Sequence, residues 1–88
     1  MKKQRPKPIF QQIRQQARTR GGRSITRQDI VTLTGLTPGE VYVVDIGGYS
    51  SRETLQTVLL AFNSLTGLRL TMDDIRHGGA MLPRVKVS

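Results

Sequence analysis

Residues 26–47, TRQDIVTLTGLTPGEVYVVDIG, carry the pattern that decides the fold of this chain. Thr26 is followed three residues later by an acid, Asp29. Thr37 is followed by Glu40 at the same spacing. In such a pair the threonine hydroxyl accepts a hydrogen bond from a free N–H of the first helical turn, and the acid accepts one from the threonine's own backbone. The stretch therefore predicts two helices, one beginning after each threonine.

The segment between these two helices is short. Gly35 is suited to end the first helix because glycine adopts a positive φ at little cost. Pro38 is suited to open the second because the first helical position needs no N–H donor. The helices are therefore predicted at about residues 27–34 and 38–46, which makes a helix-turn-helix. The apolar residues expected on its inner side are Ile30, Leu33, Leu36, Val41 and Val44.

A shorter amphipathic pattern precedes this unit, and Pro8 can open its helix. Apolar side chains recur there at helical spacing, at Phe10, Ile13 and Ala17. The other faces are polar and include Arg14, which we therefore expect on the outer side of the helix. The glycine pair at residues 21–22 is expected to end it.

The widest apolar stripe of the chain follows the central unit. Ser50 and Glu53 form a capping pair that would open a long helix, and Gly67 would end it. Burial of each large apolar side chain contributes roughly 1.5–3 kcal/mol, so this helix is expected to supply much of the core. Thr71 and Asp74 form one more pair and predict a short fifth helix. The stripe consists of Leu55, Val58, Leu59, Phe62 and Leu65.

These elements predict an all-α, compact five-helix domain over residues 8–77, preceded by a flexible arm at residues 1–7 and followed by a tail at residues 78–88. In the tail Val85 and Val87 alternate with polar residues, which is the period of a half-exposed strand. A lone strand needs a partner, and the same strand of a second copy would serve in a homodimer. A frayed terminus explains the tail equally well.

The net charge of +8 is unevenly distributed. Residues 1–27 hold nine basic side chains and no acidic one, whereas residues 28–88 hold five basic and six acidic side chains. A lysine or arginine that meets a phosphate releases condensed counterions, so such a segment favours a nucleic acid partner. Membranes and acidic proteins attract the same charge, and a solvated tail is the simplest alternative. The basic residues of the arm are Lys2, Lys3, Arg5 and Lys7.

Composition argues against several other classes of protein. The chain has no cysteine, one histidine and few acids, which supplies neither a nucleophile with its base nor three metal ligands. We therefore expect no enzymatic activity, no catalytic residue, no metal and no cofactor. The absence of cysteine suits a reducing compartment, so we expect a cytoplasmic location. No apolar run is long enough for a signal peptide or a membrane span, so we expect no membrane association.

The central stretch and its flanks resemble one known family. ITRQDI at residues 25–30, TGLT at residues 34–37 and ETL at residues 53–55 are similar to the start of its second helix, its turn and the opening of its fourth helix. The family is that of the Cro and phage-repressor-like helix-turn-helix regulators, often called the XRE family, and the resemblance covers about residues 9–75. It implies a lambda-repressor-like DNA-binding domain, prokaryotic or phage-encoded, which regulates transcription by binding double-stranded DNA as a homodimer.

The resemblance also implies where DNA would be bound. The helix at residues 38–46 would enter the major groove. Arg27 would lie near a phosphate, with Thr26 and Gln28 assisting. The exposed face of the second helix, which would meet the bases, carries Thr37, Glu40, Tyr42 and Val43.

The chemistry of this face is unusual for a helix that reads bases. Glu40 can accept from a cytosine amino group, but its capping box explains this acid more simply. Thr37 and Val43 can touch a thymine methyl group, and Tyr42 can reach a phosphate or a base. Pro38 also stands where family members often have a polar, base-reading side chain.

Two other functions remain open. The acidic and apolar residues of the second helix favour a protein-interaction module, such as an antitoxin or an assembly factor, that retains the helix-turn-helix as architecture. These residues are Glu40, Val43, Asp45 and Ile46. An RNA-binding accessory protein would instead bind mainly through the basic arm.

Overall fold

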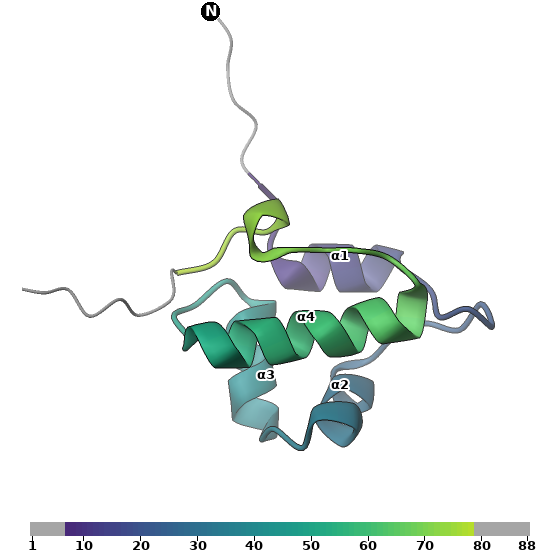
Figure 1. Cartoon of the computed structure of the whole chain (residues 1–88), viewed down its shortest axis with the longest axis horizontal. Helices are drawn as coiled ribbons and strands as arrows, with labels where there is room; N and C mark the ends of the chain where they lie inside the picture. Colours follow the sequence, from purple (N-terminus) through teal and green to yellow (C-terminus); the bar gives the residue numbers. More distant parts are fainter. Residues whose placement is uncertain (1–6, 79–88) are drawn as a thin grey trace, which may run out of the picture.

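The structure is a computed structural model that describes residues 7–78. Within that range the chain forms four α-helices and one turn of 3-10 helix, and no β-strand. The elements are α1 (Phe10–Gln16), α2 (Arg27–Thr34), α3 (Pro38–Asp45), α4 (Arg52–Thr66) and η1 (Met72–Asp74). Figure 1 shows α1 on one side of α4, and α2 and α3 on the other. The predicted all-α fold class is confirmed for these residues.

The helix-turn-helix forms with the predicted boundaries except that α3 ends at Asp45, one residue earlier than predicted. The Thr26 hydroxyl accepts from the backbone N–H of Asp29, and the Thr37 hydroxyl accepts from that of Glu40, each over 3.1 Å. Gly35 ends α2 in the left-handed region with φ +77°. Both capping boxes and the glycine turn are therefore confirmed.

The inner side of this unit differs from the prediction at one residue. Ile30, Val41 and Val44 are buried and Leu36 packs against the core, but 52% of Leu33 is exposed. The face of α2 that meets the core is centred on Ile30, and Leu33 lies beyond its edge. The prediction that Leu33 faces inward was wrong.

The longest helix, α4, begins one residue later than predicted. Of the two adjacent serines, Ser51 and not Ser50 caps the helix, because its hydroxyl accepts from the backbone N–H of Thr54 over 3.0 Å. Gly67 ends the helix in the left-handed region, as predicted. No helix between residues 7 and 78 is long and apolar enough to cross a membrane.

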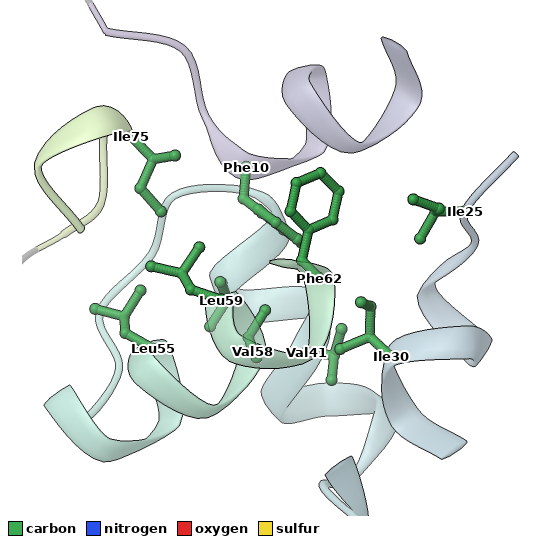
Figure 2. Packing of buried hydrophobic residues seen from close by; sticks show 10 residues of the cluster. Phe10, Ile25, Ile30, Val41, Leu55, Val58, Leu59, Phe62 and Ile75 are labelled. Carbon is green, nitrogen blue, oxygen red and sulfur yellow. The ribbon is translucent and has the colours of Figure 1, made fainter. Parts of the chain in front are cut away.

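The core lies between α4 and the other elements, as Figure 2 shows. The rings of Phe10 from α1 and Phe62 from α4 meet edge to face, with their centroids 5.1 Å apart. Such a pair adds about 0.5–1.5 kcal/mol to the burial of the two rings. The other buried core residues are Ile25, Ile30, Val41, Val44, Leu55, Val58, Leu59 and Ile75.

The first helix is shorter than predicted. It ends at Gln16, and Ala17 already has extended backbone with ψ 162°. The chain then doubles back between Arg18 and Ser24, so the glycine pair at residues 21–22 forms a turn instead of a helix end. The early end has a tertiary cause, since the chain must return to bury Ile25 in the core.

The predicted fifth helix is only the 3-10 turn η1. Its cap forms, because the backbone N–H of Thr71 donates to the Asp74 carboxylate over 2.8 Å. Ile75 then takes extended backbone, which buries its side chain in the core. The backbone N–H of Arg76 donates to the Pro8 carbonyl over 2.8 Å, so the end of this domain is tied to its beginning. Predictions for the arm at residues 1–6 and the tail at residues 79–88 lie outside the described residues.

Candidate nucleic-acid interface

A buried ion pair connects α1 to the end of α3, the second helix of the helix-turn-helix. Asp45, in the last turn of α3, is fully buried, and it accepts two hydrogen bonds from Arg14 of α1. The Nε–Oδ1 distance is 3.0 Å and the Nη2–Oδ2 distance is 2.8 Å, so the pair is bidentate. Arg14 Nη1 also donates to the Ile25 carbonyl over 2.9 Å. The prediction that Arg14 faces outward was wrong, and Asp45 is no part of an acidic surface on α3.

A second arginine binds the same carboxylate from the surface. Arg27, the first residue of α2, donates from Nε to Asp45 Oδ2 over 3.1 Å. Its side chain is 43% exposed and lies over the ring of Tyr42, 5.0 Å from the centroid. Two arginines thus share one carboxylate, which leaves a net positive charge beside the exposed face of α3.

The geometry leaves part of Arg27 available to a ligand. Asp45 holds the guanidinium through Nε alone, and within residues 7–78 neither terminal nitrogen has a protein partner. The Tyr42 ring covers one face of the group and restricts its orientation. A guanidinium held in this way presents two N–H donors in one plane, which suits two oxygens of a phosphate.

Two of the proposed base-reading residues are already engaged within α3. The Glu40 carboxylate accepts from the backbone N–H of Thr37 over 2.9 Å and from the Thr37 hydroxyl over 3.2 Å. That hydroxyl in turn accepts from the Glu40 backbone. In the structure, Glu40 therefore serves the capping box of α3, as the simpler of the two interpretations predicted.

The remaining predicted contacts differ in their exposure. Tyr42 is 46% exposed, whereas Val43 is half-buried and lies against Gly48. Gln28 is exposed and donates from its amide to the Thr32 hydroxyl over 3.2 Å. Of the arm residues only Lys7 lies within the described range, where it is exposed; Lys2, Lys3 and Arg5 lie outside it.

An ion pair at the start of α2 was not anticipated. Arg23 Nη1 lies 3.0 Å from Asp29 Oδ2, and the same carboxylate oxygen accepts from the backbone N–H of Thr26. The backbone hydrogen bond from Thr26, followed by that from Arg23, holds the pKa of Asp29 below its ordinary value of 3.8. The carboxylate that caps α2 therefore stays ionised at a lower pH than an ordinary aspartate would.

The residues that sequence reasoning missed did have a signal. Arg14 comes four residues after Phe10, and Asp45 comes four residues after Val41. Positions four apart lie on the same face of a helix, and both Phe10 and Val41 are buried. An arginine and an acid on two buried faces would have to pair, because an isolated buried charge is very costly.

The described residues bring together a defined set of groups around the start of α2 and the end of α3. These are the Arg14–Asp45–Arg27 network, the Tyr42 ring over Arg27, and the two helix caps. Residues 7–78 contain no group of three or more His, Cys, Asp or Glu side chains placed to hold a metal ion. No protein-family model matches this chain, and no curated protein or solved structure matches it.

Proposed function

We propose that this protein is a sequence-specific transcriptional regulator that binds double-stranded DNA, with α3 in the major groove. The observation that carries the proposal is Arg27 at the start of α2. Buried Asp45 holds its guanidinium through Nε, the side chain is 43% exposed, and within residues 7–78 neither terminal nitrogen has a protein partner. Arg27 lies beside Tyr42, the exposed side chain of the helix that would read bases. A phosphate anchor next to a reading helix is the arrangement by which helix-turn-helix proteins bind DNA.

Arg27 would position the domain on the DNA backbone. A charged hydrogen bond pair from one guanidinium to a phosphate is among the stronger polar contacts that proteins make. It carries no sequence information, because every nucleotide has the same phosphate. The role of Asp45 would be to fix the direction in which Arg27 points.

Tyr42 and Thr37 would supply sequence preference. The Tyr42 hydroxyl can donate to or accept from a base edge, and the Thr37 methyl group can contact a thymine methyl group. The Thr37 hydroxyl already serves the helix cap. We therefore propose that direct readout by α3 is sparse, with Tyr42 as its main polar contact.

The basic N-terminal segment would add affinity without sequence preference. Residues 1–27 hold nine of the fourteen basic residues of the chain. Of these, Arg14 is buried against Asp45 and Arg27 is the anchor described above, whereas Lys7 lies exposed where the described domain begins. Each phosphate contact made by this segment would release counterions and make binding weaker at high salt.

A matched pair of variants tests this assignment in a competition assay at fixed salt. Arg27→Ala should weaken binding to a selected site and to random duplex equally, because it removes a phosphate contact. Tyr42→Phe should weaken the selected site alone, by on the order of 1–3 kcal/mol for one hydrogen bond to a base. Phenylalanine keeps the ring over Arg27, so the second variant removes only the hydroxyl. Equal losses of affinity on both duplexes for Tyr42→Phe would contradict direct readout.

A second function is favoured by one observation. The helix α3 carries no lysine or arginine, and at its end Ile46 is 43% exposed. A protein-interaction module, such as an antitoxin or an assembly factor, would use this surface to bind a protein partner. The two proposals predict different results of a selection from random duplexes. A DNA-binding regulator should enrich one sequence, whereas a protein-interaction module should enrich none.

A further inference from the structure

The outer face of α4 carries an exposed apolar side chain between two grooves. Leu60 is 69% exposed and lines both of them. One groove, of about 330 Å³, lies between α2 and α4 and is lined by Leu33, Thr34, Thr57, Leu60, Ala61 and Ser64. The other, of about 500 Å³, lies between α4 and the segment that leads to η1. A protruding side chain between two grooves allows this face to pack against the same face of a second copy, with each Leu60 in a groove of the other.

The residues one turn away from Leu60 along α4 are uncharged, and the larger groove beside it is also lined by one side chain of each charge, Arg52 and Asp73. Those one turn away along α4 are Gln56, Thr57, Asn63 and Ser64. In a chain of net charge +8, two copies repel each other, so a surface on which they meet must exclude like charges. The middle of the α4 face meets that requirement.

The two ends of the same face carry opposite charges. Glu53 lies seven residues before Leu60 and Gly67 seven residues after it, which places all three on one line of the helix. The Arg20 guanidinium packs at Gly67, where a Cβ atom would lie 3.3 Å from its Nη2. The Arg20 backbone N–H also donates to the Leu65 carbonyl over 3.2 Å. Within residues 7–78, neither Glu53 nor Arg20 has an ion-pair partner.

We propose that this chain forms a homodimer in which the α4 helices of two copies pack antiparallel about a two-fold axis at Leu60. In that arrangement each Leu60 fits the groove beside the Leu60 of the other copy. Glu53 of each copy then faces Gly67 of the other, and with it Arg20. Two ion pairs would thus flank an apolar centre, each about 10 Å from the axis by the 1.5 Å rise per residue. A shallow crossing near 20° keeps these ends within reach of each other.

This surface is separate from the one proposed to bind DNA. A dimer is also expected from the proposed function, but the assignment of α4 as its interface rests on the grooves and charges alone. The test is therefore made without DNA, so its failure would leave the Arg27 and Tyr42 assignment untouched. The alternating tail at residues 84–88 is the competing location for a dimer contact.

Sedimentation equilibrium of the full chain over a series of concentrations tests the centre of the interface. The wild-type chain should dimerise, and Leu60→Lys should raise the dimer dissociation constant at least about tenfold, which corresponds to about 1.4 kcal/mol. Tyr49→Lys is the matched control, since Tyr49 is also 69% exposed and lies outside this face. A wild-type monomer at every concentration, or a Leu60→Lys dimer of unchanged affinity, would overturn the proposal.

Charge-reversal variants test the two ion pairs at the ends of the proposed interface. Glu53→Arg and Arg20→Glu should each weaken the dimer, and the double variant should restore it because each pair is regenerated with its charges exchanged. Both residues also complement the dipole at an end of α4, so each reversal should lower the melting temperature, and the double variant should not recover it. A double variant that dimerises more weakly than either single one would contradict the pairing. A dimer that survives Leu60→Lys but is abolished in Val85→Lys would place the interface in the tail instead.

Discussion

Asp45 is the residue at which three helices meet. It lies in α3 and binds Arg14 from α1 and Arg27 from α2. The carboxylate is fully buried, so its charge is tolerated only because it accepts three charged hydrogen bonds. The Arg27 side chain, by contrast, is 43% exposed, and solvent weakens its contribution.

Removal of Asp45 should therefore destabilise the domain strongly. In Asp45→Ala the buried Arg14 loses its partner, and the free energy of unfolding should fall by about 3–5 kcal/mol. Arg27→Ala is the control, because loss of the exposed arginine should cost no more than about 1 kcal/mol. Urea unfolding followed by circular dichroism measures both. Similar losses of stability in the two variants would mean that the pair is not buried as described.

Asp29 should make the stability of the fold depend on pH in the acidic range. Its folded pKa lies below 3.8, so the ionised carboxylate stabilises the fold above that pH. This contribution should disappear as the pH falls from about 3.8 through the lowered folded pKa, since protonation then breaks the contacts to Thr26 and Arg23. The urea midpoint of Asp29→Asn should fall less steeply over this range than that of the wild type. Parallel curves for the two proteins would contradict the assignment.

At the scale of elements, two glycines with positive φ allow a direct comparison. Gly35 has φ +77° and open space around a possible Cβ atom, so Gly35→Ala should cost only backbone strain, roughly 1–2 kcal/mol. Gly47 has φ +80°, and a Cβ atom there would lie 2.9 Å from Ile9 Cγ2 and 3.2 Å from the Arg76 carbonyl oxygen. Gly47→Ala should therefore lower the melting temperature more than Gly35→Ala. The reverse order would show that the loop at Gly47 is not packed against both ends of the domain.

The elements that were predicted correctly are those whose ends depend on neighbouring residues. The caps at Thr26 and Thr37 and the glycine ends of α2 and α4 are decided within four positions along the chain. The end of α1 and the conformation after η1 depend instead on contacts with residues far away in the sequence. In both places the helix stops where the chain must turn to bury an isoleucine, Ile25 in the first case and Ile75 in the second. Local patterns do not contain that information.

The candidate site was predicted in its parts but not in its connections. Arg27 and Tyr42 were identified separately, yet their stacking and the link through Asp45 to Arg14 join residues up to 31 positions apart. The position of Arg14 and Asp45 one turn beyond buried residues was the available signal. Its meaning depends on knowing which faces of α1 and α3 meet, which only the packed molecule shows.

At the scale of the whole molecule, the charge asymmetry should control the salt dependence of DNA binding. A variant with Lys2, Lys3, Arg5 and Lys7 all changed to Gln should have a shallower log–log salt slope, by up to roughly 0.9 for each phosphate that the arm no longer neutralises. The control changes Arg84 and Lys86 to Gln, which removes basic charge from the other end of the chain. A slope equal to that of the wild type would show that the arm does not reach the DNA backbone.

The most direct test of the central claim is selection of the full chain on a library of random duplexes, with single-stranded DNA and RNA of the same composition as competitors. DNA recognition through α3 predicts an enriched duplex sequence that neither competitor displaces at equal concentration. It also predicts a near-palindrome with half-site centres about 34 Å apart, one turn of DNA, if two copies bind. Selection that yields no enriched sequence, or retention of RNA in preference to duplex, would contradict the account. In the first case a protein partner for α3 becomes the better explanation.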